Sequence, residues 1–126
     1  MVPAADARKI AMTLQGAADE SDDRRLVFSI AGKGFAWTFM RRPAPKAKRV
    51  PDVSVLAVRC TMESKHMLIA AAPNIYFDDD HYRNFPAVLV RLKAIGKKEF
   101  TALLEKAWEL QKPKPRASRA KRAERK

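Results

Sequence analysis

The sequence predicts an α+β fold in which a mostly antiparallel β-sheet packs against helices as a two-layer sandwich. Three observations favour this class. Residues 97–111 place apolar side chains along one stripe of a helix. Apolar and polar residues alternate over short runs elsewhere in the chain, which is typical of half-buried strands. The chain has 126 residues, of which 47% are hydrophobic, and this suffices for the core of one domain.

Three helices are expected, over residues 4–15, 62–72 and 97–111. Thr61 is a suitable N-cap for the middle helix, and Pro73 ends it. We expect the inner stripe of this helix to consist of Ser64, Met67, Leu68 and Ala71. The inner stripe of the last helix is expected to consist of Phe100, Leu103, Leu104, Ala107 and Trp108. Helices therefore open, divide and close the predicted domain.

Five strands are expected, at residues 26–30, 35–39, 53–59, 75–77 and 87–95. The first two flank a Gly-Lys-Gly turn and form a hairpin, and the acidic segment 18–23 before them is interpreted as a loop. In the last strand, Val88, Val90 and Leu92 point toward the core, whereas Leu89, Arg91 and Lys93 point toward a mostly wet, basic face. The resulting order of elements is α-β-β-β-α-β-β-α.

The net charge of +12 is concentrated in two short segments that contain proline. Residues 41–49 hold five basic residues and no acidic one, and residues 112–126 hold eight basic residues and one acidic one. Because residues 113–126 have no aliphatic side chain larger than alanine, we expect a folded domain over residues 1–112 and a disordered basic tail over residues 113–126. A basic excess of this kind attracts nucleic acids, anionic membranes or acidic proteins, or serves only solubility.

The candidate contacts to nucleic-acid phosphates lie in three places. They are Arg41, Arg42, Lys46, Lys48 and Arg49 in the first basic segment, Arg91 and Lys93 on the predicted basic strand face, and Arg116, Arg119, Lys121 and Arg122 in the tail. Arginine favours bidentate phosphate contacts, and a basic strand face can lie against nucleic acid. Cations on a flexible tail add affinity without reading bases. For Arg91 and Lys93, ordinary solvation of an exposed sheet face is the alternative.

Aromatic residues flank the polar loop at residues 78–86. Tyr76, Tyr82 and Phe85 either stack on unpaired bases or anchor the loop to the core. Trp37 and Trp108 are expected in the core because they continue apolar strand and helix patterns.

No pattern in the sequence indicates catalysis, a metal or a cofactor, and we expect a protein that is not an enzyme. Asp78, Asp79, Asp80 and His81 are adjacent at a strand end, where neighbouring side chains point in different directions and do not converge on an ion. Cys60 is the one cysteine, expected as a small buried residue. The chain shows no membrane-spanning run and no signal-peptide pattern, so we expect a cytoplasmic protein.

The element order and several segments together resemble the MmcQ/YjbR family over about residues 6–113. The segments are GKGFAW, VSVLAVRCTMESKHMLIAAAPNIYF, DDDHYRNFPAVLVRL and EFTALLEKAWELQKPK. The resemblance implies a fold like that of CyaY, the frataxin homologue, with a curved antiparallel sheet packed on helices. It also implies DNA binding through a double wing of β-hairpins. Phe85 stands where many family members have a tryptophan before the penultimate strand.

Two hypotheses of function follow. In the first, the protein binds nucleic acid, DNA in preference to RNA, through phosphate contacts from the basic loop, the exposed sheet face and the tail, with little sequence specificity. In the second, the domain binds a protein or a small ligand, and the tail only keeps it soluble. The sequence does not indicate an oligomeric state.

Overall fold

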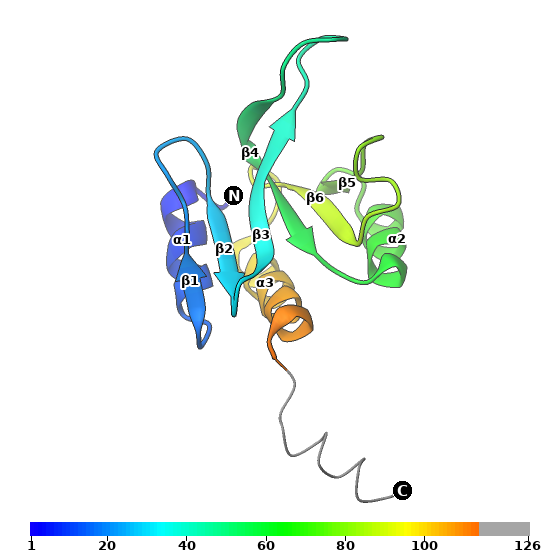
Figure 1. The fold of residues 1–126 in the computed structure, drawn as a ribbon. Helices are drawn as coiled ribbons and strands as arrows, with labels where there is room; N and C mark the ends of the chain where they lie inside the picture. Colours follow the sequence, from blue (N-terminus) through cyan, green and yellow to red (C-terminus); the bar gives the residue numbers. More distant parts are fainter. Residues whose placement is uncertain (114–126) are drawn as a thin grey trace, which may run out of the picture.

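A six-stranded antiparallel sheet and three helices make up residues 1–113, the part of the chain that the computed structural model describes (Figure 1). The helices are α1 (Ala4–Met12), α2 (Met62–Ala71) and α3 (Lys97–Gln111). The strands are β1 (Ala17–Asp19), β2 (Val27–Ile30), β3 (Lys33–Arg41), β4 (Val50–Arg59), β5 (Tyr76–Phe77) and β6 (Ala87–Arg91), and their order in the sheet is β1-β2-β3-β4-β6-β5. The predicted α+β class is confirmed. None of these helices is long and apolar enough to cross a membrane.

One strand was not expected. Ala17–Asp19 forms the edge strand β1, which overlaps the segment interpreted as a loop. It pairs with β2 in the register Ala17↔Ile30. A segment of three residues with one polar position shows too little alternation to indicate a strand. It forms a strand because it pairs with β2.

Helix α2 confirms the predicted cap but not the predicted inner stripe. Thr61 Oγ1 accepts a hydrogen bond from the backbone N–H of Ser64 at 3.0 Å. Met67, however, is 64% exposed, and Lys65 is fully buried. The inward-facing residues are Lys65, Leu68 and Ile69 of the helix and Ala72 at its C-cap. The helix is turned toward Lys65 because Lys65 has partners in the loop at residues 78–86, which no periodicity within the helix indicates.

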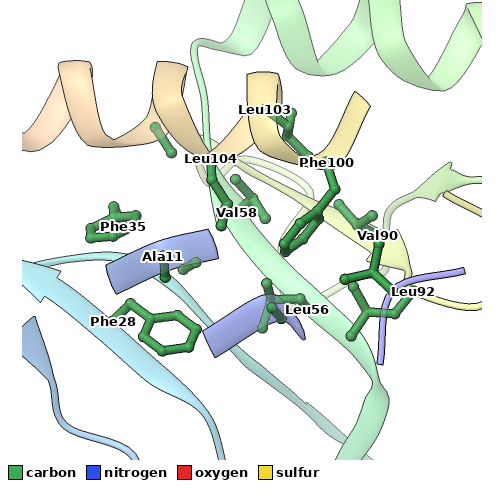
Figure 2. Close-up of a cluster of buried hydrophobic side chains, with 14 of the residues drawn as sticks. Ala11, Phe28, Phe35, Leu56, Val58, Val90, Leu92, Phe100, Leu103 and Leu104 are labelled. Carbon is green, nitrogen blue, oxygen red and sulfur yellow. The ribbon is translucent and has the colours of Figure 1, made fainter. Parts of the chain in front are cut away.

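All three helices lie on one face of the sheet and enclose the main hydrophobic core. Alternate strand residues such as Leu56, Val58 and Val90 point into it, as expected. Phe100 of α3 projects between the helix and the sheet and is fully buried (Figure 2). The predicted inner stripe of α3 is buried, with Trp108 only half-buried at its end.

The opposite face of the sheet is not wet, which corrects the prediction made from the last strand. Leu89 is fully buried in a second hydrophobic cluster with Phe39, Val55, Ala57, Tyr82 and Ala87. The loop at residues 78–86 folds back over this face and covers it with Tyr82, which is 8% exposed. The strand itself ends at Arg91, so Lys93 lies in the following turn, where the backbone N–H of Ala94 bonds to the carbonyl of Arg91 at 3.0 Å.

The β3–β4 hairpin extends beyond the rest of the sheet (Figure 1). The pairing shifts at Thr38: Thr38 faces Leu56, but the next residue, Phe39, faces Asp52. Of the three residues of β4 skipped by this shift, Val55 pairs with Arg91 of β6, and the backbone carbonyl of Ser54 accepts from the backbone N–H of Leu92 at 2.9 Å. A bulge of this kind bends a strand. The outer part of the hairpin therefore stands as an arm in which β3 and β4 pair only with each other, while Phe39 at its base packs against Phe77 and Tyr82.

Candidate nucleic-acid interface

The tip of the β3–β4 arm is residues 41–49, which we call the basic loop. Arg41, Arg42, Lys46 and Lys48 are exposed there, and Arg49 is half-buried. The loop contains no acidic residue. Lys46 has a φ of +68°, a left-handed conformation that non-glycine residues adopt rarely and mostly in turns. The proline-containing connection expected from the sequence is thus the closed end of a hairpin.

Two of the five loop cations are engaged within the chain. Arg49 Nη1 donates to the carbonyl of Met40 at 2.8 Å, and Arg41 Nε lies 3.6 Å from Asp52 Oδ2 at the base of the arm. Arg42, Lys46 and Lys48 make no side-chain hydrogen bond or ion pair with any residue in the range 1–113. These three cations are free to bind an external anion.

Arg91 and Lys93 are both exposed, as expected. Arg91 pairs with Val55 in the sheet register, which places it beside the stretch of β4 from which the arm rises. Its guanidinium lies 4.1 Å from the ring centroid of Phe77 and donates to the carbonyl of Pro73 at 3.1 Å. The candidate tail residues Arg116, Arg119, Lys121 and Arg122, and the prediction of a disordered tail, lie outside the described residues.

The three aromatic residues proposed for base stacking differ in accessibility. Tyr76 is 1% exposed, and its hydroxyl donates to a carboxylate oxygen of Glu99 at 2.5 Å. Tyr82 is also buried, and its hydroxyl oxygen accepts from Trp37 Nε1 at 2.9 Å. Burial raises the pKa of both phenols above the ordinary value. With their rings covered, Tyr76 and Tyr82 anchor the fold and offer no stacking surface, whereas Phe85 is 39% exposed.

Phe85 belongs to an aromatic cluster on the loop-covered face of the sheet. We call this set the aromatic face; its members are Trp37, Phe39, Phe77, Tyr82 and Phe85. Phe85 makes edge contacts with Trp37 and Tyr82, at centroid distances of 6.2 and 5.8 Å. Such contacts add about 0.5–1.5 kcal/mol each beyond the area they bury. The ring of Phe85 is therefore held in place although it is exposed.

A fully buried lysine fixes the loop that carries Phe85. Lys65 Nζ donates to the carbonyls of Tyr82 and Phe85, the latter at 3.0 Å, and lies 3.0 Å from Asp78 Oδ1. Burying an ammonium group is costly unless its hydrogen-bonding capacity is met, and these three oxygens meet it. Lys65 thereby ties helix α2 to both the start and the end of the loop.

The acidic residues of the same loop are taken up by local contacts. Asp79 accepts from the backbone N–H of Tyr82 at 3.0 Å, and Asp80 pairs with Arg83. With Asp78 bonded to Lys65, the three carboxylates point to three different partners. Within residues 1–113, no group of three or more histidine, cysteine, aspartate or glutamate side chains is gathered as metal ligands would be.

Arg59, the last residue of β4, lies beside Phe85. Its guanidinium carbon is 5.2 Å from the ring centroid of Phe85. It forms no ion pair and no side-chain hydrogen bond with the described residues. Its Nε is the one buried side-chain nitrogen or oxygen among residues 1–113 that has no hydrogen-bond partner.

The helix side of the molecule carries an apolar groove between α2 and α3, which Arg59 also lines at one end of β4. Its volume is about 560 Å³, and its walls include Met67, Leu68, Leu103 and Leu110. Cys60 also lines it, and burial raises the pKa of its thiol to about 11. A thiol with this pKa stays protonated near neutral pH and is a poor nucleophile.

Comparison with known proteins identifies the family of the chain. The family model YjbR matches residues 12–110, most of the chain. The chain belongs to the YjbR family. The resemblance inferred from the sequence is thereby confirmed.

Relatives of this YjbR-family protein include two mycobacterial sequences. The uncharacterized proteins Mb2600 of Mycobacterium bovis and Rv2570 of Mycobacterium tuberculosis are each 40% identical over 65 residues, which cover 51% of this chain. The match spans about half of each relative's length (50%). The solved structure of Deinococcus radiodurans protein DR2400, domain DUF419, has a TM-score of 0.63 at 20% identity, over 87% of this chain and 78% of that one. This likeness supports the fold.

Sequence reasoning missed two residues of the interface in this YjbR-family protein. Arg59 was only the polar end of a predicted strand, and Lys65 was placed off the inner stripe of its helix. Their partners, Phe85 and Asp78, are 26 and 13 residues further along the chain, so no local pattern links them. No signal in the local sequence points to Arg59, since an acidic residue, Glu63, lies only four positions further along the chain.

Proposed function

We propose that this YjbR-family protein binds nucleic acid, DNA in preference to RNA, mainly through phosphate contacts made by the basic loop. The observation that carries the proposal is the set of three exposed cations, Arg42, Lys46 and Lys48, that have no partner in the described chain. They stand at the end of an arm that projects from the sheet (Figure 1). Projecting β-ribbons are an established way of reaching nucleic acid.

The distribution of charge supports the same conclusion. Acidic residues at the base of the arm and in the neighbouring loop, such as Asp52 and Asp78, are already bonded to Arg41 and Lys65. Asp52 and Asp78 therefore do not serve as partners for Arg42, Lys46 and Lys48. A polyanion that docks there releases condensed counterions, which makes affinity fall steeply with salt.

The remaining cations have subordinate roles in this proposal. Arg91, beside the base of the arm, extends the basic surface along the sheet, and Lys93 adds a charge in the next turn. Arg116, Arg119, Lys121 and Arg122 would hold phosphates without reading bases. The preference for DNA rests on the resemblance to a family described as DNA-binding through β-hairpin wings.

Fluorescence anisotropy with a labelled oligonucleotide, in single-stranded and duplex form, tests the proposal. The variant is the full chain with Arg42, Lys46 and Lys48 replaced by glutamine. Each lost phosphate contact should reduce the steepness of log K against log salt by about 0.9 on duplex DNA, or about 0.7 on single strands. We therefore expect a reduction of about 2–3 for the triple variant.

The matched control replaces Arg24, Lys33 and Lys98 by glutamine. This set has the same residue types and the same loss of charge, all three are exposed, and none lies on the arm. In the control, the steepness of log K against log salt should equal that of the native protein. Equal losses in both variants, or no binding of either form of the oligonucleotide at low salt, would refute the proposal.

A second candidate function is the binding of a small apolar molecule, which the groove between α2 and α3 favours. Its volume of about 560 Å³ lies in the range of ligand sites, about 300–1,000 Å³. Ala71 and Ala102 line it and are exposed, so replacing either by phenylalanine fills the groove from opposite walls. Fluorescence of an apolar dye such as ANS should rise with the native protein and not with the filled variants. Equal dye fluorescence in all three proteins would dismiss the groove as a site.

A further inference from the structure

We infer that the nucleic acid bound by this protein is single-stranded at the point of contact, with an unpaired base held at the pair formed by Phe85 and Arg59. This inference rests on the proposed function and names the form of the ligand.

The first step is the exposure of Phe85. It is the one aromatic side chain among residues 1–113 that ranks with the exposed large hydrophobic residues, at 39%. Half-buried Trp37 and buried Tyr82 contact its ring, and Phe85 lies at the rim of the aromatic face. Aromatic rings at the rim of a cationic surface are the stacking platforms on which single strands are held.

The second step is the unmet hydrogen-bonding capacity of Arg59. Nearly all buried polar groups in proteins have a partner, so the isolated Nε of Arg59 calls for a specific explanation. Its guanidinium already lies against the Phe85 ring, and bases stack on guanidinium groups as they do on aromatic rings. The buried Nε is out of reach of a ligand, but the terminal Nη groups of Arg59 also lack a hydrogen-bond partner among the described residues. They can donate to a base carbonyl or a phosphate oxygen of the bound nucleotide.

The third step is that the platform is fixed before any ligand arrives. Lys65 holds the carbonyl of Phe85 at 3.0 Å, and the backbone N–H of Phe85 donates to the carbonyl of Tyr82 at 3.0 Å. A ring held in this way loses little conformational entropy when a base stacks on it. The chain buries a lysine to hold this loop.

The fourth step is the form of the ligand. A base within a duplex is stacked on both sides and paired, so only an unpaired base can reach a ring on the protein surface. A second guanidinium–aromatic pair, Arg91 with Phe77, lies on the same face of the sheet. Arg59 faces Ala87 and Arg91 ends the same strand, so the two arginines are about 13 Å apart, at about 3.3 Å per residue. Arg91 lies near the base of the arm and Arg59 at the far end of β4, so an extended strand that runs from the arm along this face meets Arg91 first and Arg59 second.

The test compares Phe85→Leu and Phe85→Trp in the full chain, with one oligonucleotide as single strand and as duplex. Leucine keeps the apolar contact and removes the ring, whereas tryptophan keeps a stacking surface. Loss of one stacked base should weaken single-strand binding by about 5- to 100-fold in Phe85→Leu, whereas Phe85→Trp should bind about as well as the native protein. Stacking releases no counterions, so the salt dependence of Phe85→Leu should equal that of the native protein.

The outcomes separate this inference from the proposed function. Preference of the native protein for the single strand, together with a loss confined to Phe85→Leu, supports the inference. Equal binding of both forms, with Phe85→Leu unchanged, overturns the inference and leaves the basic-loop proposal standing. Absence of binding to either form overturns both. Thermal unfolding of the variants shows that the comparison is made on folded protein. If Phe85→Leu does not fold, the native protein still tests the inference, because binding the duplex as tightly as the single strand would overturn it.

Discussion

The two faces of the sheet differ in how they are covered and in what they leave accessible. On the helix side, Phe28, Leu56 and Phe100 are fully buried beneath α1 and α3 (Figure 2). On the other side, a single loop covers the aromatic face, and Phe85 and Arg91 stay exposed at its rim. The helix side therefore supplies most of the free energy of folding, whereas the loop-covered side presents cations and an aromatic ring to the solvent.

A pair of matched substitutions provides the strongest test of this contrast. Phe100→Ala should lower the free energy of unfolding by about 3–5 kcal/mol, because it removes a fully buried ring from the helix-side core. Phe85→Ala should cost less, about 1–3 kcal/mol, because the ring is already partly in water and mainly its edge contacts with Trp37 and Tyr82 are lost. Urea unfolding of both variants measures the difference. Equal losses would mean that the two faces contribute alike to stability.

Replacement of Lys65 tests how the loop-covered face is held together. Lys65→Met keeps the length of the side chain but leaves two carbonyls and the carboxylate of Asp78 without their partner. Breaking a buried ion pair costs about 3–5 kcal/mol, and because Asp78 is partly exposed we expect a loss of about 3 kcal/mol. Hydrogen exchange should also rise in residues 78–86. An unchanged exchange rate there would show that Lys65 does not fix the loop.

Alkaline pH should distinguish the two faces as well. Burial raises the pKa of Cys60, on the helix side, from 9.0 to about 11, so the folded state favours the protonated thiol. The stability that this provides is complete below pH 9 and is lost as pH rises toward 11. Between pH 9 and 10 the thiol should account for a loss of about 1 kcal/mol, and the phenols of Tyr76 and Tyr82, whose pKa values are also raised, add to the loss as pH approaches 10. Cys60→Ala should show a smaller loss over this interval in urea titrations, and an identical loss would contradict the burial of the thiol.

A smaller effect is expected at the start of α2. Thr61→Ala removes the hydroxyl that accepts from the backbone N–H of Ser64 and should cost about 1 kcal/mol. Because the hydroxyl of Thr61 bonds within its own helix and not to the loop at residues 78–86, the substitution should not change nucleic-acid binding while the protein is folded. Thr61→Ser, which keeps the hydroxyl, serves as the control in thermal unfolding. A loss as large with serine as with alanine would refute the cap.

The sequence was most informative where a residue's environment depends on its own segment. The helix over residues 97–111 and the cap at Thr61 were predicted correctly, because the helical stripe and the cap both arise from neighbours within one turn. Leu89 was misjudged because its alternation is the same whether the outer face meets water or a folded-back loop. The burial of Lys65 and the pairing of Arg59 with Phe85 depend on contacts between segments, which periodicity does not contain. The charge of the basic loop was evident, but the bulge that makes it an arm was not.

The central claim is that the folded domain, and not only its basic tail, binds nucleic acid. The direct measurement is the salt-dependent anisotropy of the full chain in which Arg116, Arg119, Lys121 and Arg122 are replaced by glutamine. We expect this variant to retain binding, with a steepness of about 2–3 in log K against log salt that disappears when Arg42, Lys46 and Lys48 are also replaced. If the tail substitutions alone abolish binding to both single-stranded and duplex oligonucleotides at low salt, the tail is the binding element and the claim is wrong.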